Sequence, residues 1–259
     1  MFYKIFLLSL SILIQNCSNS NIDSQELKTD IFLGIDKIKY LTGDFSRDKV
    51  LKGFKNPNEE RVHHLREDVV LAFQKMIKAY DIDREGKDNQ PIFIISAHRN
   101  YSDQKMIWEE KFSGKRKMRE SVTGKTDEEK INLILEFSSA PSTSRHHWGT
   151  DFDINNLTNS YFETGNGKFL YLWMKKNAAK FGFCQPYNEH EKRNFKGYKE
   201  EKWHWSYFPI SSKLMLEWEK AFQENKINFE NKFSGSNKLG QRPLEYVKTI
   251  NSDCLNVSK

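Results

Sequence analysis

The sequence predicts an α+β domain, in which helices and short strands do not alternate regularly along the chain. Apolar residues recur at helical spacing in several segments, and short runs of strand-forming residues separate these segments irregularly. No glycine-rich phosphate loop follows any of the predicted strands, so a nucleotide-binding fold has no support. With 259 residues, 13 Gly, 6 Pro and 14% aromatic residues, the chain is long and apolar enough to bury one substantial core.

Residues 1–16 have the pattern of a secretory signal peptide. A lysine precedes the apolar run 5–14, which is too short to span a bilayer and has the length of a signal-peptide core. Cys17 stands where a bacterial lipoprotein signal places its acylated residue, although the two residues before it are larger than usual. We predict an exported lipoprotein in the periplasm or at the cell surface, membrane-anchored through Cys17 and a linker over residues 17–30. An ordinary secretory signal or an uncleaved anchor is the alternative.

Compact structure is expected over residues 31–226, followed by a C-terminal tail, 227–259, with little periodicity. Within residues 59–80 an amphipathic helix is predicted, because apolar side chains recur every three or four positions. These are Leu65, Val69, Phe73, Met76, Ile77 and Tyr80. Residues 92–95 are continuously apolar, which predicts a strand covered on both faces.

The elements that follow are shorter. A helical stretch includes Trp108 and Phe112, and residues 113–126 form a basic loop. Thr126 and Glu129 match a capping box ahead of a short helix. The remaining predicted elements are strands over 152–154 and 203–207, a helix over 168–181 capped by Gly182, a surface loop over 185–200 and a last helix over 212–224.

The formal net charge of +6 is modest and spread along the chain, so we predict no nucleic-acid partner. Beyond Cys17 the chain holds two further cysteines, Cys184 and Cys254. In an exported protein these two residues could form a disulfide. The sequence alone leaves their pairing open, because it does not give the distance between their Cα atoms.

Residues 144–153 bring imidazoles and carboxylates together. A glycine and the strand-like residues after it predict a loop entering a strand, which can fold His146 back over Asp153. Asp151 shares a strand face with Asp153, and His147 adjoins His146, so both are competing ligands.

A second segment supplies Glu201 and His204. Residues three apart on a strand point to opposite faces, so Glu201 is expected on the loop that enters the strand. If His146, Asp153 and His204 bind zinc, the fourth position stays open for water, as a catalytic site requires. Glu201 is then free to accept a proton from that water, with Glu200 as a weaker alternative.

Motifs in these segments resemble those of a known enzyme family. Four residues reproduce the Ser-x-His-x-x-Gly-x-x-x-Asp motif of the zinc D-alanyl-D-alanine carboxypeptidases, which include the vancomycin-resistance D,D-peptidases: Ser144, His146, Gly149 and Asp153. Residues 201–204 match the Glu-x-Trp-His element of that family, with Lys202 where Pro is common. Residues 96–99 followed by Gln104 resemble its Ser-x-x-Arg…Gln segment. The resemblance covers about residues 40–210 in matching order.

The resemblance implies a hedgehog/D,D-peptidase-like α+β fold, with a small antiparallel sheet, packed helices and a zinc site in a cleft. It implies Zn2+ ligands at His146, Asp153 and His204, a catalytic base at Glu201, a charge-stabilising Arg99, and substrate binding by Ser144 and Gln104. The structural alternatives are a fold-stabilising ion pair for Arg99, an exposed helix position for Gln104 and a turn for Ser144.

We therefore expect a zinc metallopeptidase that removes the terminal D-Ala from peptidoglycan stem peptides. An L,D-carboxypeptidase or a crosslink endopeptidase of the same fold remains open, because the motifs are shared. A non-catalytic zinc-containing wall-binding lipoprotein is a further alternative. The presence of both Glu201 and Arg99 argues against that last alternative.

Overall fold

The computed structural model describes residues 30–86 and 90–255. The predicted signal peptide, Cys17 and the linker up to residue 29 lie outside the described residues. Within the described ranges, no helix combines the length and the apolar character that a membrane span requires.

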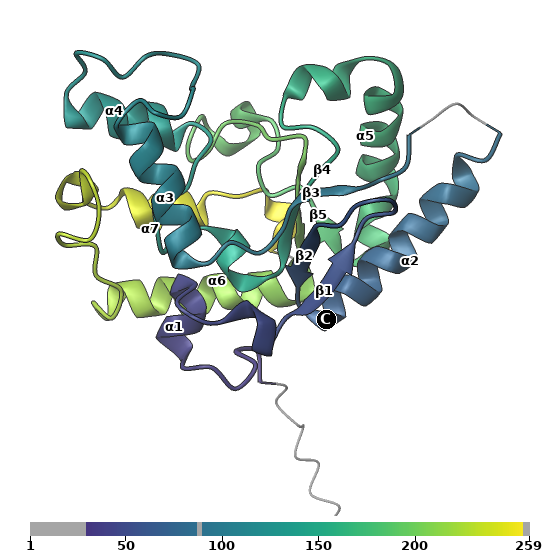
Figure 1. The fold of residues 1–259 in the computed structure, drawn as a ribbon, viewed down its shortest axis with the longest axis horizontal. Helices are drawn as coiled ribbons and strands as arrows, with labels where there is room; N and C mark the ends of the chain where they lie inside the picture. The colour runs from purple at the N-terminus through teal and green to yellow at the C-terminus, as the bar shows by residue number, and fades with distance from the viewer. Residues whose placement is uncertain (1–29, 87–89, 256–259) are drawn as a thin grey trace, which may run out of the picture. The chain divides into compact units, whose positions relative to one another are not determined.

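The described chain folds into helices and two small antiparallel sheets, which confirms the predicted α+β class (Figure 1). The α-helices are α1 (Lys37–Thr42), α2 (Glu67–Asp83), α3 (Tyr101–Phe112), α4 (Asp127–Leu135), α5 (Gly165–Asn177), α6 (Phe208–Gln223) and α7 (Arg242–Lys248). The strands are β1 (Lys52–Lys55), β2 (Val62–Leu65), β3 (Ile94–Ser96), β4 (Asp151–Ile154), β5 (Phe183–Cys184) and β6 (His204–Tyr207).

The larger sheet has the strand order β3-β4-β6-β5, and every neighbouring pair is antiparallel. Successive side chains of a strand point to opposite faces, so the register of β4 against β6 sorts polar from apolar side chains. The register pairs Asp151 with Ser206, Phe152 with Trp205, and Asp153 with His204. One face of the central strands is therefore polar and the other is apolar.

Two hydrophobic clusters flank this sheet. The apolar face packs against α2 and α5, where the Phe73 ring contacts the rings of Phe152 and Phe183 at centroid distances of 4.7 Å and 6.4 Å. Helices α1, α3, α4, α6 and α7 contribute to the other cluster, which includes Trp108 and Trp218. Figure 1 shows α2 and α5 on one side of the sheet and α3, α4 and α6 on the other. Each buried aromatic side chain contributes about 1.5–3 kcal/mol of transfer free energy.

Local signals fix several helix ends. The predicted capping box is present at α4, where Thr126 and Glu129 exchange hydrogen bonds with each other's backbone N–H. A second capping box, of Asn100 and Asp103, begins α3. Gly182 ends the helical segment before β5 with a φ of 83°, as predicted, because a left-handed backbone suits glycine.

Two elements differ from the prediction. The helix expected within residues 59–80 begins only at Glu67, because residues 62–65 pair with β1 as a strand. The prediction that the strand formed by residues 92–95 is covered on both faces is also wrong. β3 lies at the edge of its sheet, and Ile95 is only half-buried.

The segment 185–200 was expected at the surface, but much of it is buried. Arg193 is 5% exposed and donates hydrogen bonds to the carbonyl oxygens of Asn188, Lys196 and Tyr198 at 3.0, 2.9 and 2.6 Å. This internal arginine satisfies the backbone of a polar segment, so the segment can fold inward without a large desolvation cost. Polar composition alone suggested a solvated loop.

Residues after Lys226 pack against the rest of the unit, which extends from residue 31. Phe233 contacts Trp108 of α3 at a centroid distance of 5.4 Å, and α7 lies against α6. Cys254 forms a disulfide with Cys184 of β5, which closes a separation of 70 residues. Irregularly spaced buried side chains, polar contacts and one disulfide hold this segment, so it shows little periodicity in the sequence.

Candidate active site

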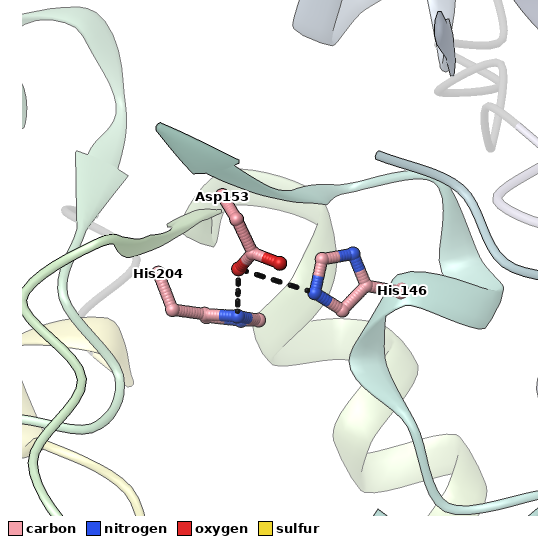
Figure 2. A group of neighbouring side chains, drawn as sticks. All are labelled: His146, Asp153 and His204. Atoms are coloured by element: carbon pink, nitrogen blue, oxygen red, sulfur yellow. Dashed lines mark hydrogen bonds and ion pairs between the residues drawn. The ribbon is translucent and has the colours of Figure 1, made fainter. Parts of the chain in front are cut away.

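Three buried side chains meet on the polar face of the larger sheet. His146 comes from a 3-10 turn, η2 (Arg145–Trp148), Asp153 from β4 and His204 from β6. Their ligating atoms all lie within 4.8 Å of one another. Asp153 Oδ1 lies 3.4 Å from His146 Nε2 and 2.9 Å from His204 Nδ1 (Figure 2).

The arrangement of these rings fits a bound metal ion. His146 Nδ1 lies 2.7 Å from the carbonyl oxygen of Ala97, while its buried Nε2 has no hydrogen-bond partner. His204 Nε2 lies 2.9 Å from Asp151 Oδ2, so its other nitrogen faces Asp153. Histidines that bind metals characteristically donate their second N–H to a carbonyl or a carboxylate in this way. Two imidazole nitrogens and one carboxylate oxygen are a suitable ligand set for zinc.

The two competing ligands are both occupied elsewhere. His147 Nδ1 lies 2.7 Å from the carbonyl oxygen of Arg99, and its Nε2 accepts a hydrogen bond from the Ser142 backbone N–H at 3.2 Å. Asp151 accepts hydrogen bonds from Arg145 Nε, at 2.9 Å, and from His204. Both ring nitrogens of His147 are engaged by backbone groups, and Asp151 contacts His204 at the ring nitrogen that faces away from Asp153.

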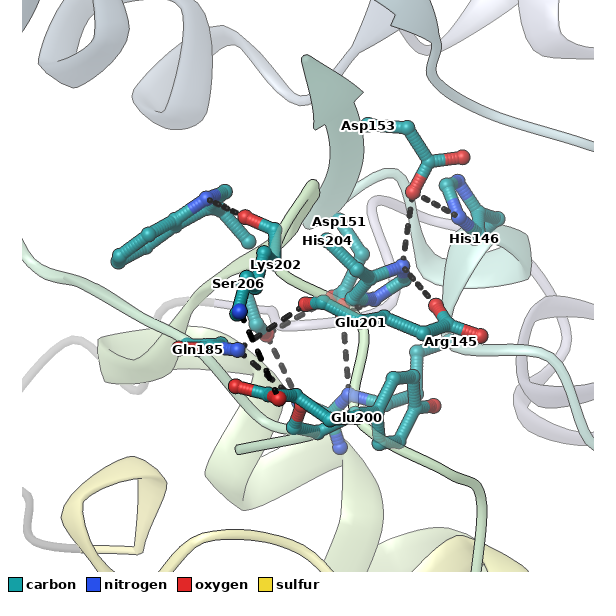
Figure 3. Close-up of polar contacts among 12 residues, drawn as sticks. Arg145, His146, Asp151, Asp153, Gln185, Glu200, Glu201, Lys202, His204 and Ser206 are labelled. Carbon is teal, nitrogen blue, oxygen red and sulfur yellow. Dashed lines mark hydrogen bonds and ion pairs between the residues drawn. The ribbon is translucent and has the colours of Figure 1, made fainter. Parts of the chain in front are cut away.

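Asp151 is the centre of a buried network behind His204 (Figure 3). Besides Arg145 and His204, the hydroxyls of Thr150 and Ser206 donate to its carboxylate at 2.6 and 2.9 Å. Burial alone would raise the pKa of Asp151, but the arginine and the hydrogen bonds hold that pKa well below its usual range. The carboxylate therefore stays ionised and fixes the orientation of the His204 ring.

Glu201 lies on the segment that leads into β6, where the sequence placed it. Its carboxyl group is buried, and Oε2 lies 3.7 Å from His204 Nδ1 (Figure 3). Burial raises the pKa of Glu201 to about 8. Glu200 instead accepts a hydrogen bond from the Tyr171 hydroxyl at 3.4 Å. Of the two acidic residues, only Glu201 faces the cluster.

Arg99 and Gln104 are joined to each other. Arg99 Nη1 donates to Gln104 Oε1 at 2.9 Å, and Gln104 Nε2 donates to the Ser139 carbonyl oxygen at 2.7 Å. Gln104 is completely buried, and both the oxygen and the nitrogen of its side-chain amide are hydrogen-bonded. It therefore positions Arg99, whose guanidinium borders the site.

A small chamber adjoins the cluster, with a volume of about 20 Å³. Arg99, Ser144, Tyr187, Tyr198 and Glu201 border it together with the two imidazoles, whereas Gln104 does not. The Ser144 hydroxyl is buried and has no hydrogen-bond partner. The chamber thus combines a cation, an acid and an unengaged hydroxyl beside the ligand cluster.

Two residues near the chamber escaped the sequence analysis as site candidates. The Tyr187 ring covers His204 at a centroid distance of 4.8 Å, from the segment expected at the surface. Lys111 of α3 donates to the hydroxyl of Ser138, which borders the chamber, and burial lowers the pKa of Lys111 to about 8. Lys111 follows Gln104 by seven residues, so both lie on one helix face. This spacing could have identified Lys111 as a site candidate from the sequence.

The comparison with protein families decides the class of this protein. The VanY family, described as D-alanyl-D-alanine carboxypeptidase, matches residues 62–210. This chain belongs to the VanY family. The matched range includes all three residues of the cluster together with Arg99 and Glu201. The expectation that the chain is a carboxypeptidase of this family is therefore confirmed.

Solved structures include several that are similar to this VanY-family chain. One is a variant of the vancomycin-resistance D,D-pentapeptidase VanY from a VanB-type resistance cassette, in complex with Zn(II), at 20% identity, 68% and 85% coverage of the two chains and a TM-score of 0.47. VanYB in complex with D-alanine-D-alanine has 20% identity, 73% and 88% coverage and a TM-score of 0.47. The LD-carboxypeptidase LdcB has 19% identity, 69% and 88% coverage and a TM-score of 0.40. No curated protein matches the chain.

Proposed function

We propose that this protein is a zinc-dependent D,D-carboxypeptidase that removes the terminal D-Ala from peptidoglycan stem peptides. The observation that carries the proposal is the buried cluster of His146, Asp153 and His204 with the Glu201 carboxyl group beside it. Zinc bound there supplies a Lewis acid, which polarises the scissile carbonyl and lowers the pKa of water.

Different residues of the chain would bind the ion, transfer the proton and stabilise the developing charge. His146, Asp153 and His204 would hold the ion, and their outward hydrogen bonds keep the rings in place. Glu201 takes the proton of the attacking water and delivers it to the departing amine, as a positioned general base and then acid. Arg99, held by Gln104, opposes the negative charge that develops on the carbonyl oxygen.

The polar groups around the chamber suit the carboxylate end of a peptide. The product of the proposed reaction is free D-Ala, which is small and carries a carboxylate. Lys111 lies behind Ser138 at the chamber wall, and Ser144 presents an unengaged hydroxyl there. A cation and a hydroxyl are suitable partners for a terminal carboxylate. The family match to D-alanyl-D-alanine carboxypeptidases supports the same specificity.

Defined muropeptides test the proposal directly. The purified protein, loaded with zinc, is incubated with monomeric pentapeptides, monomeric tetrapeptides and crosslinked dimers, and products are identified by mass spectrometry. We expect loss of one D-Ala from the pentapeptide, abolished by a chelator and restored by zinc. Conversion of tetrapeptide to tripeptide would instead indicate an L,D-carboxypeptidase, and release of monomers from dimers an endopeptidase. Binding without any product would identify a wall-binding protein.

We further propose that the protein is exported and anchored through an acylated Cys17. The apolar run before Cys17 supports this, as does the Cys184–Cys254 disulfide, because disulfides persist in oxidising compartments. Metabolic labelling with a radioactive fatty acid tests the anchor. The wild-type protein should incorporate label and Cys17→Ser should not, whereas equal labelling would reject Cys17 as the modified residue.

A further inference from the structure

A second and larger cavity, of about 510 Å³, shares Arg99 with the catalytic chamber. It is bordered by the 3-10 turn η1 (Arg47–Lys49), by β2, and by the segment that joins β3 to the first turns of α3. We refer to this cavity as the basic pocket. Arg99 is the one residue with a proposed catalytic role that borders it.

Arginines dominate the charge of the basic pocket. Four border it, namely Arg47, Arg61, Arg99 and Arg116, against two carboxylates, Asp48 and Asp103. Both carboxylates are engaged. Asp48 lies 3.2 Å from His64 Nε2, and Asp103 accepts from Arg47 at 3.4 Å while it caps α3. Arg61 is exposed, and no carboxylate among the described residues pairs with it. Arg116 pairs with Glu110 at 2.6 Å, so the four arginines exceed the carboxylates around them by one positive charge.

His98 adds an unengaged polar group to the pocket wall. Its ring packs against Phe45 in a tilted arrangement, at a centroid distance of 5.1 Å, and the residue is only 5% exposed. Both ring nitrogens are buried without a hydrogen-bond partner. Burial, reinforced by His147 and Arg47, lowers the pKa of His98 to about 2, so the ring is neutral. A neutral imidazole always carries one N–H donor, and a buried donor normally has an acceptor.

The two cavities differ in what they can accommodate. The chamber is small and bordered by two buried tyrosines, so it has room for only a small group beside the cluster. The basic pocket is far larger and reaches the surface at Arg61. A carboxypeptidase must bind the last residue in a closed space and leave a path for the rest of the peptide. Arg99 stands at the junction of the two spaces.

Building on the proposed function, we propose that the basic pocket is a subsite for a carboxylate on the acyl side of the scissile bond, supplied by an acidic residue of the stem peptide. The planar guanidinium group matches a carboxylate through two parallel hydrogen bonds, which distinguishes this subsite from a simple hydrophobic one. The His98 N–H provides a further donor. The enzyme therefore prefers stem peptides with free acidic side groups over amidated ones.

Equilibrium binding tests this subsite independently of turnover. Two synthetic pentapeptides ending in D-Ala-D-Ala are compared, one with free glutamyl and diaminopimelyl carboxylates and one with both amidated. Their Kd values are measured by calorimetry on the zinc-loaded, full-length Glu201→Gln protein. We expect the acidic peptide to bind about tenfold more tightly, which corresponds to about 1.4 kcal/mol.

Two further substitutions in the Glu201→Gln protein test whether the preference for the acidic peptide depends on the basic pocket. Arg61→Gln removes an exposed charge, and His98→Phe removes the donor while keeping an aromatic ring of similar size against Phe45. Each should weaken binding of the acidic peptide by about fivefold or more and leave the amidated peptide within about twofold. Arg242→Gln, which removes an arginine of α7 that does not border the pocket, should alter neither Kd. Equal affinity of the two peptides for the parent protein would overturn the proposal, as would equal weakening of both by the pocket variants.

The catalytic proposal and the subsite proposal are contradicted by different results. If the wild-type protein binds the acidic peptide selectively but releases no D-Ala from it, the subsite stands and the catalytic proposal falls. If it releases D-Ala from both peptides and binds them equally, the catalytic proposal stands and the subsite falls.

Discussion

Asp151 lies 2.9 Å from Nε2 of His204, while Nδ1 of the same ring faces Asp153 at 2.9 Å. Asp151 is in turn held by Arg145 in the interior. The His204 ring therefore cannot rotate without breaking a bond at a buried carboxylate. A residue that the sequence offered as a competing ligand instead orients a histidine of the cluster.

Replacing Asp151 by Asn should weaken zinc binding by about 10–100-fold, the usual effect of losing a carboxylate that orients a ligating histidine. Competition with a chromophoric chelator measures this affinity. Ser206→Ala is the control, because it removes one donor to Asp151 and leaves the contact with His204 intact. Wild-type affinity in a folded Asp151→Asn protein would show that the ring is oriented by other contacts.

Replacing Glu201 by Gln should preserve stoichiometric zinc and lower kcat by about 10²–10⁴-fold, since only the proton acceptor is lost. Glu200→Gln is a closely matched control. Its carboxylate bonds to Tyr171 and not to the cluster, so turnover should stay near the wild-type rate. Near wild-type turnover in Glu201→Gln together with a large loss in Glu200→Gln would assign the role of base to Glu200.

Removing His146 or His204 should abolish stoichiometric zinc, measured by elemental analysis of the purified variants. His147→Ala provides the contrast. It loses two buried hydrogen bonds, which should lower the free energy of unfolding by about 1–3 kcal/mol, but it should still bind zinc. A full complement of zinc in His204→Ala would contradict the assigned ligand set.

The Cys184–Cys254 disulfide joins β5, the neighbour of β6, to the C-terminal segment. Replacing both cysteines by serine should lower the free energy of unfolding by about 2–5 kcal/mol. Denaturant unfolding measures this change. Reducing agent should lower the stability of the wild-type protein and leave that of the double variant unchanged. Equal sensitivity of the two proteins to the reducing agent would argue against this pairing.

Lys111→Met should raise the KM for peptides that end in a free carboxylate by about tenfold, because a half-buried cation near the chamber is lost. The same peptide with a C-terminal amide should show a much smaller change. Steady-state kinetics on the two peptides separate a contact with the substrate from a structural effect. An equal rise in KM for both would assign Lys111 a structural role.

Much of the fold followed from local rules. The capping box of Thr126 and Glu129 is a contact between residues three apart, and Gly182 meets a backbone requirement at a single position. The period of apolar residues located the main part of α2 and α5 for the same reason. β2 was missed because a strand is stabilised by its partner, and Val62–Leu65 pairs with a segment that has no signal of its own.

The sequence by itself determined the α+β class, the family motifs and the residues from which the site is built, since these depend on residue types at short separations. Spacing alone left His147 and Asp151 as competitors of His146 and Asp153, and the tertiary structure shows why only His146 and Asp153 meet in the cluster. Those choices depend on which ring nitrogen or carboxylate oxygen already has a partner from a distant segment, such as Ala97, Arg99 or Arg145. The basic pocket has the same origin, because η1, β2 and α3 form it only after they pack together.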